Sequence, residues 1–145
     1  MKMPDVNVLV YAHRGDQPAH AFYRRWMEDL VQSRAPFAMS TLVGVAFVRI
    51  VTHPGFPGRP TPLAIALETI EQVREAPNCR WLVPGERHWE IVADLCRRSR
   101  CLGKRVADAQ HAAVAMEHGC RWVSRDADFE AFVPCGLDWE HLVPD

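Results

Sequence analysis

Four aspartates are the side chains of this sequence that are best suited to chemistry: Asp5, Asp108, Asp126 and Asp128. Each also has an ordinary structural explanation. Asp5 adjoins an apolar run, and an exposed residue at the end of a strand explains it as well as a functional carboxylate does. Asp108 lies in the first turns of a predicted helix, where an acid suits the helix dipole. Asp126 and Asp128 follow another apolar run, where they are suited to cap a short helix.

These aspartates acquire a chemical role only if the fold brings them to one place. Several ionised carboxylates can share a pocket only when a cation neutralises them. Oxygen ligands favour a hard ion, Mg²⁺ or Mn²⁺. Such an ion polarises a phosphodiester and activates water as a nucleophile. The acids therefore predict metal-dependent phosphodiester hydrolysis, provided that they converge.

The elements that must position these acids alternate between strand and helix patterns. The run VNVLVY at residues 6–11 is β-branched and nearly all apolar, which predicts a buried parallel strand with Asp5 near its start. Thr61 is predicted to cap the helix that follows it, and Gly119 to end another. Further strands are predicted at 36–39, 80–83, 121–123 and 137–142, and helices at 18–33, 42–51, 63–75, 86–98 and 105–118.

This alternation predicts one α/β domain over residues 1–145, built as three α/β/α layers around a mainly parallel sheet. Ligands of such sheets gather at the carboxyl ends of the strands. Asp126 directly follows a predicted strand, so it is expected at that edge. The sequence thus predicts where the acids would have to meet.

The composition narrows the class of protein further. A chain of 145 residues with 48% apolar and 24% charged residues is typical of a globular protein. The net charge of −1 provides no general attraction to nucleic acid. The five cysteines show no CxxC spacing and no secretory signal precedes them, so we expect reduced thiols in the cytoplasm. No apolar run reaches the ~18 residues that a membrane span needs.

Two segments carry a resemblance to a known family: DVNVLVYA, residues 5–12, and GKRVADAQHAAVAMEHGCRWVSRDADF, residues 103–129. They resemble the PIN-domain ribonucleases, specifically the VapC toxins of bacterial toxin–antitoxin pairs. The segment FVRIVTHP, residues 47–54, is similar to one actinobacterial-looking branch of that family. The resemblance implies a PIN-like fold, an Mg²⁺- or Mn²⁺-dependent endoribonuclease, a homodimer and a cognate VapB-type antitoxin.

The resemblance also implies roles for particular residues. Asp5 and Asp108 match the family's principal metal-binding aspartates. Asp126 matches the acid that follows the late strand, with Asp128 as its neighbour. Ser124 matches the small hydroxyl residue that usually precedes that acid. Asn7 matches a position that often supports the first aspartate.

One position departs from the family's pattern. The family usually has a glutamate in the helix after the second strand, and here the corresponding residue is Ala46. No acid occurs between Asp29 and Glu68. The site is therefore expected to have one carboxylate fewer, with a water molecule or Asp128 in its place or with a lower affinity for metal.

Three basic residues are candidates for RNA contacts. Lys104 and Arg105 stand at a helix start, where the dipole disfavours cations, so they are suited to face phosphates. A solvated loop pair is an equally good explanation for them. Arg49 borders a proline-containing loop and could reach RNA, although a structural arginine in a polar network is the simpler interpretation.

Two other functions remain open. An aspartyl-nucleophile phosphatase would use Asp5 to attack phosphate, but such an enzyme normally has a second acid two residues later, where this chain has Asn7. A PIN fold that binds RNA or a partner without cleavage is motivated by the missing glutamate.

Overall fold

A five-stranded parallel sheet forms the centre of the protein, whose computed structural model describes residues 1–145. The strand order is β3-β2-β1-β4-β5. Lys2 on β1 is in register with Phe37 on β2 and with Arg121 on β4. The strands are β1 (Lys2–Pro4), β2 (Phe37–Ser40), β3 (Cys79–Leu82), β4 (Arg121–Ser124) and β5 (Trp139–His141). The predicted parallel α/β class is confirmed, and every pairing is parallel.

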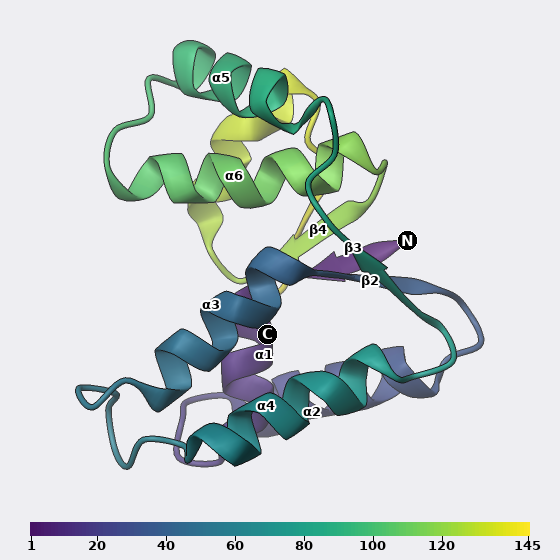
Figure 1. The fold of residues 1–145 in the computed structure, drawn as a ribbon, viewed down its shortest axis with the longest axis vertical. Coiled ribbons are helices and arrows are strands. Elements are labelled where there is room, and N and C mark those ends of the chain that lie inside the picture. Colours follow the sequence, from purple (N-terminus) through teal and green to yellow (C-terminus); the bar gives the residue numbers. More distant parts are fainter.

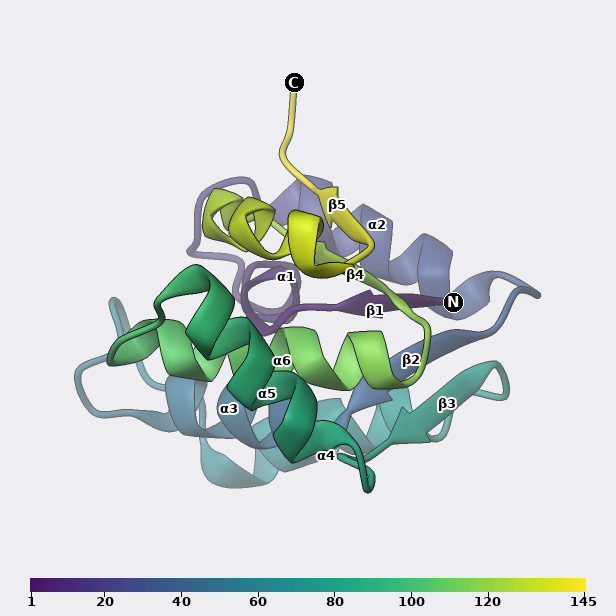
Figure 2. The ribbon, with the colours of Figure 1, turned by 90° about the horizontal axis from the view of Figure 1, so that it is seen from above.

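Helices flank this sheet on both sides, as Figures 1 and 2 show. Figure 2 places α2 over one face and α5 and α6 over the other. In Figure 1, α5 and α6 form the upper part of the molecule and α1 to α4 the lower part. The helices are α1 (Val6–His13), α2 (His20–Gln32), α3 (Thr41–Thr52), α4 (Leu63–Arg74), α5 (His88–Ser99), α6 (Lys104–Glu117) and the 3₁₀ helix η1 (Ala127–Cys135).

The strand predicted at residues 6–11 is wrong, because this segment is the helix α1. The first strand is instead Lys2–Pro4. The apolar run fitted a strand because α1 buries Val8, Leu9 and Val10 in succession, and a short helix buried on most sides has the composition of a buried strand. Asp5 therefore stands at the carboxyl end of a strand and not at the start of one.

The cap predicted at Thr61 is also wrong. The residue before α4 is Pro62, and no side chain caps this helix. The hydroxyl oxygen of Thr61 instead accepts a hydrogen bond from Arg14 at 3.1 Å. The helix predicted at 42–51 is confirmed as α3, which Ser40 caps by accepting from the amide of Leu42 at 3.1 Å.

One connected core holds the layers together. It contains 30 buried residues from both halves of the chain, including Met3 of β1 and Trp122 of β4. The helix α6 contributes mainly alanines to it, which allows that helix to lie close to the sheet. None of the helices is long and apolar enough to cross a membrane.

Candidate active site

The first acid of the site is placed by the pairing of the two central strands. Pro4 of β1 is in register with Val123 of β4, and the amide of Asp5 donates to the carbonyl of Val123 at 2.8 Å. Asp5 and Ser124 are therefore brought together at the carboxyl edge of the sheet. The side chain of Asp5 also caps α1 by accepting from the Val6 amide at 2.6 Å.

A serine connects Asp5 to Asp126. The hydroxyl of Ser124 donates to Oδ2 of Asp5 at 2.6 Å and accepts from the amide of Asp126 at 2.9 Å. Asn7 lies at the other side of this serine, with its Nδ2 donating to the hydroxyl oxygen at 3.4 Å. Asn7 and Ser124 therefore fix the loop after β4 against the start of α1.

The third acid, Asp108, comes from α6. The residue is 8% exposed, and its carboxylate accepts from Nη1 of Arg105 at 2.9 Å, one turn earlier in the same helix. The other Nη of Arg105 donates to the carbonyl of Asp128 at 3.1 Å, and its guanidinium lies 4.8 Å from the ring centre of Phe132. Arg105 thus joins α6 to η1 beside the acids.

The electrostatics show that these acids affect one another. The pKa of Asp5 is raised to about 6, mainly by burial. The hydrogen bonds from Ser124 and Val6 lower this pKa, and the charges of Asp108 and Asp126 add to the rise. Burial also raises the pKa of Asp108, to which the charge of Asp126 adds. Mutual repulsion of buried carboxylates is the condition that a bound cation relieves.

The donor set fits a hard divalent ion of the kind that completes its shell with water. No group of three or more His, Cys, Asp or Glu side chains is close enough to hold an ion by protein ligands alone. Mg²⁺ is usually bound by one or two carboxylates, with waters and substrate phosphates as the remaining ligands. The two buried carboxylates, Asp5 and Asp108, suit that mode because burial removes solvation from both. Asp108 has Arg105 as a charge partner, and Asp5 has none.

The family model of the PIN domain matches residues 2–133. This chain belongs to the PIN-domain family.

Relatives and solved structures agree with this membership. The PIN domain is 38% identical over 132 residues to Ribonuclease VapC25 of Mycobacterium tuberculosis, covering 91% of this chain and 93% of that protein. It is 38% identical over 137 residues to VapC ribonuclease Mb2897 of Mycobacterium bovis, with 94% and 92% covered. Its fold is similar to that of Mycobacterium tuberculosis VapC20, with a TM-score of 0.69, 15% identity, and 99% and 100% covered.

A complex gives a similar match. VapBC2 from Rickettsia felis, bound to a DNA fragment from its promoter, matches this PIN domain with a TM-score of 0.69 and 15% identity over 96% of each chain. At 15% identity this similarity shows a shared fold and nothing more.

The other residues predicted for the site differ in their exposure and in their relation to the acids. Asp128 is exposed, and it is its backbone carbonyl that meets Arg105. The positive charge of Lys104 lowers the pKa of Asp108, against the larger effect of burial. Arg49 is exposed on α3 and lines a groove of about 430 Å³ between α3 and α4, with no contact to the acids. Ala46 lies on α3 and leaves this helix without a carboxylate.

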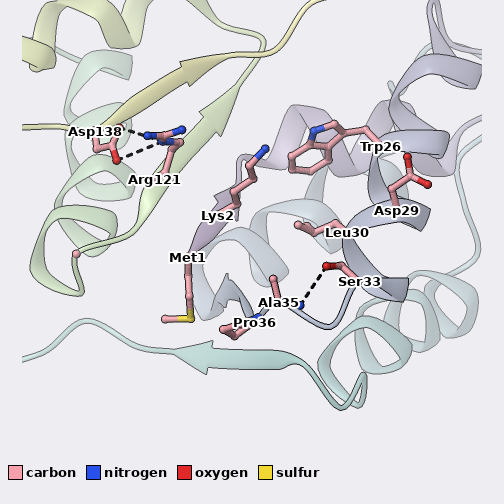
Figure 3. Close-up of a pocket in the computed structure, with 11 residues that line it drawn as sticks. Met1, Lys2, Trp26, Asp29, Leu30, Ser33, Ala35, Pro36, Arg121 and Asp138 are labelled. Atoms are coloured by element: carbon pink, nitrogen blue, oxygen red, sulfur yellow. Dashed lines mark hydrogen bonds and ion pairs between the residues drawn. The ribbon is translucent and has the colours of Figure 1, made fainter.

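A separate cavity of this PIN domain lies at the opposite end of the strands. It has a volume of about 590 Å³ and opens beside the amino ends of β1 and β4, where Figure 3 shows Lys2, Trp26 and Arg121. Its basic residues are neutralised, because Lys2 pairs with Glu140 at 3.3 Å and Arg121 with Asp138 at 3.2 Å. The acid cluster is the better candidate, since perturbed carboxylates gather at functional sites.

One residue at the carboxyl edge of the sheet was not predicted from the sequence. Arg125 lies between Ser124 and Asp126, and its guanidinium stacks 4.2 Å from the ring centre of Tyr11. A basic residue within the SRDADF segment was the available clue.

Proposed function

We propose that this PIN domain is a metal-dependent endoribonuclease, the toxin of a type II toxin–antitoxin pair, and that residues 1–145 act as one PIN-like domain. The observation that carries the proposal is the convergence of Asp5 and Asp108, two buried acids. Burial raises the pKa of both; the charges of Asp108 and Asp126 add to the rise for Asp5, and the charge of Asp126 adds to it for Asp108. RNA as the substrate is supported by relatives named ribonucleases at 38% identity.

The metal that fits is Mg²⁺ or Mn²⁺, and the residues that would hold it are Asp5, Asp108 and Asp126, with Asp128 as a further acid at the rim. Because no three of these side chains are close enough to hold an ion by themselves, waters would complete its shell. When bound, such an ion polarises the scissile phosphate and lowers the pKa of the attacking water. The chain's own residues prepare the site for it. Ser124 holds Asp5 in one orientation through the 2.6 Å hydrogen bond, so the carboxylate is positioned before any ligand arrives.

Basic side chains complete the proposal for substrate binding. Arg105 already places a guanidinium 2.9 Å from Asp108, and Lys104 begins the same helix. Both are suited to hold RNA phosphates against a rim that would otherwise repel them. Arg49 lies on α3, apart from the acids, and would contact a more distant part of the RNA.

The partners we propose are a VapB-type antitoxin and a second copy of the chain. The antitoxin is supported by the similarity to VapBC structures, including VapBC-1 from nontypeable Haemophilus influenzae, at a TM-score of 0.64 and 17% identity over 96% of each chain. The homodimer follows from the family resemblance. We also propose a cytoplasmic location, which the five free cysteines support.

Cleavage of defined structured RNAs by the purified protein tests this function. We expect cleavage with Mg²⁺ or Mn²⁺, none with EDTA, and none with Asp5→Asn or Asp108→Asn. A matched control is Asp94→Asn, which removes an exposed acid from α5 and should leave cleavage intact. Metal-independent cleavage, or cleavage unchanged in both active-site variants, would contradict the mechanism.

A second candidate function is a PIN fold that binds RNA or a protein partner without cutting. The observation that favours it is the absence of an acid on α3, where Ala46 stands. Retained RNA binding with no cleavage under any divalent ion would support it. The phosphatase alternative would be revived only by a trapped phosphoryl group on Asp5; Asn7, two residues on, supplies an amide directed at Ser124 and not an acid.

A further inference from the structure

Arg125 is a partly buried cation without an acid partner at the edge that carries the acids. Its guanidinium lies 4.2 Å from the ring centre of Tyr11 and 5.9 Å from that of Tyr23. This guanidinium makes no hydrogen bond or ion pair within the protein, whereas the guanidinium of Arg105 pairs with Asp108 and that of Arg121 with Asp138. All five N–H donors of Arg125 are therefore available to a ligand.

The surroundings hold this side chain in place. The two tyrosine rings lie 5.6 Å apart, and Tyr23 is fully buried with its hydroxyl donating to the Leu142 carbonyl at 2.8 Å. The backbone of Arg125 is also fixed, since Nε2 of His141 lies 2.9 Å from its carbonyl oxygen. A guanidinium stacked on a rigid aromatic platform keeps the edges of its fork open, which suits bidentate phosphate binding.

Its position relates it to the acids. Tyr11 is one helical turn beyond Asn7 on α1, and Asn7 contacts Ser124. Arg125 thus lies on the α1 and α2 side of the site, while Arg105 lies on the α6 and η1 side. Figure 1 shows these two pairs of elements in different halves of the molecule, with β4 between them.

We propose that Arg125, supported by Tyr11, forms a phosphate-binding subsite for the RNA backbone adjacent to the cleaved bond. This proposal rests on the proposed function. The acids repel the substrate's phosphates, so a strand entering the site needs cations on both sides. Arg105 supplies one side and is already paired with Asp108. Arg125 supplies the other, with no internal partner to release first.

The salt dependence of RNA binding tests the subsite directly. A short single-stranded RNA is titrated in EDTA with the Asp108→Asn protein, so that the RNA stays intact. Adding Arg125→Gln should weaken binding roughly ten-fold, as expected for a charge-assisted hydrogen bond, and should reduce the slope of log K against log salt by about 0.7. Arg125→Lys should keep the slope and lose part of the affinity, because it retains the charge and loses the fork.

Two controls separate a phosphate contact from a structural role. Arg121→Gln removes the same charge from the other end of β4 and should leave the slope unchanged. Tyr11→Leu removes the platform and keeps the charge, so it should weaken binding at an unchanged slope. An Arg125→Gln protein with the parent's slope and a lowered melting temperature would overturn the subsite, because a structural arginine affects folding alone.

The same experiment distinguishes this inference from the proposed function. If the wild type cuts RNA with Mg²⁺ and Arg125→Gln leaves the salt slope unchanged, the subsite is wrong and the endoribonuclease stands. If the wild type neither binds nor cuts any RNA tested, both fail. If it binds without cutting and Arg125→Gln reduces the slope, the subsite stands and the catalytic proposal fails.

Discussion

The hydroxyl of Ser124 donates to the buried carboxylate of Asp5 at 2.6 Å, across 119 positions of sequence. Parallel pairing of β1 with β4 creates this contact, because it places the ends of the two strands side by side. The same hydroxyl oxygen accepts from the amide of Asp126. One serine thus connects two of the three acids that we assign to the metal.

Ser124→Ala should destabilise the protein and shift its activity to higher pH. The substitution leaves a buried carboxylate oxygen without its donor, which costs about 1–3 kcal/mol. The hydrogen bond from Ser124 lowers the pKa of Asp5, so its loss should raise that pKa and move the acid limb of the pH–rate profile upward. Urea unfolding and cleavage rates across pH measure the two effects. The control is Thr69→Ala, whose hydroxyl bonds only its own helix; equal shifts in both variants would refute the role of Ser124.

Without metal, stability should fall as pH rises through the range set by Asp5. Its pKa is raised from 3.8 to about 6 in the folded protein, so between these values the folded state binds more protons than the unfolded chain. The contribution of Asp5 is therefore fully present below the lower value and is lost as pH rises through the upper one, by ~3 kcal/mol. Thermal unfolding in EDTA across this range measures the loss.

Asp5→Asn should remove most of that pH dependence. Near neutral pH the variant should be more stable than the wild type in EDTA, since asparagine carries no buried charge, and the two should converge in acid. Mn²⁺ should stabilise the wild type and not the variant. Asp94→Asn serves again as an exposed control. If the stability of the wild type in EDTA does not change between pH 3.8 and about pH 6, Asp5 is not buried as an isolated acid.

Arg105→Gln should raise the pKa of Asp108 and destabilise the protein. The hydrogen bond and the charge of Arg105 both lower that pKa, and an acid 12% exposed at its side chain loses its cation. We expect a cost of about 1–3 kcal/mol in the free energy of unfolding. Arg24→Gln breaks an exposed pair with Glu28 and should cost only ~0.3–0.5 kcal/mol. Similar costs for both variants, measured by urea unfolding, would count against a special role for the Arg105 pair.

Ala46→Glu should tighten binding of Mn²⁺, because it restores the carboxylate that the family pattern has on α3 and charge count sets the affinity of such sites. Calorimetric titration with Mn²⁺ measures the change, and thermal unfolding confirms that the variant is folded. Val45→Glu is the matched control, since Val45 is the neighbouring residue on α3 and is 64% exposed. An unchanged Mn²⁺ affinity in a folded Ala46→Glu protein would show that position 46 does not face the acids.

The local sequence pattern predicted some helices correctly and others not. The helix α3 was predictable because a long apolar run ends before a proline, although its β-branched residues favoured a strand. The segment 6–11 was not predictable, because its apolar residues are buried in succession and periodicity cannot distinguish a short buried helix from a strand. The error also displaced Asp5 from the carboxyl end of a strand to the start of one.

The sequence by itself determined the chemical inventory of this protein. The alternation of strands and helices, with Gly119 after a small-residue helix, was sufficient for the fold class. The aspartates that flank apolar runs were sufficient to name the acids that we propose for the site. Only the tertiary structure decided how these parts interact. The parallel pairing of β1 with β4 brings Ser124 to Asp5, and the packing of Arg125 on Tyr11 leaves a cation without an acid partner. Contacts between residues more than a hundred positions apart depend on strand order, which no local pattern encodes.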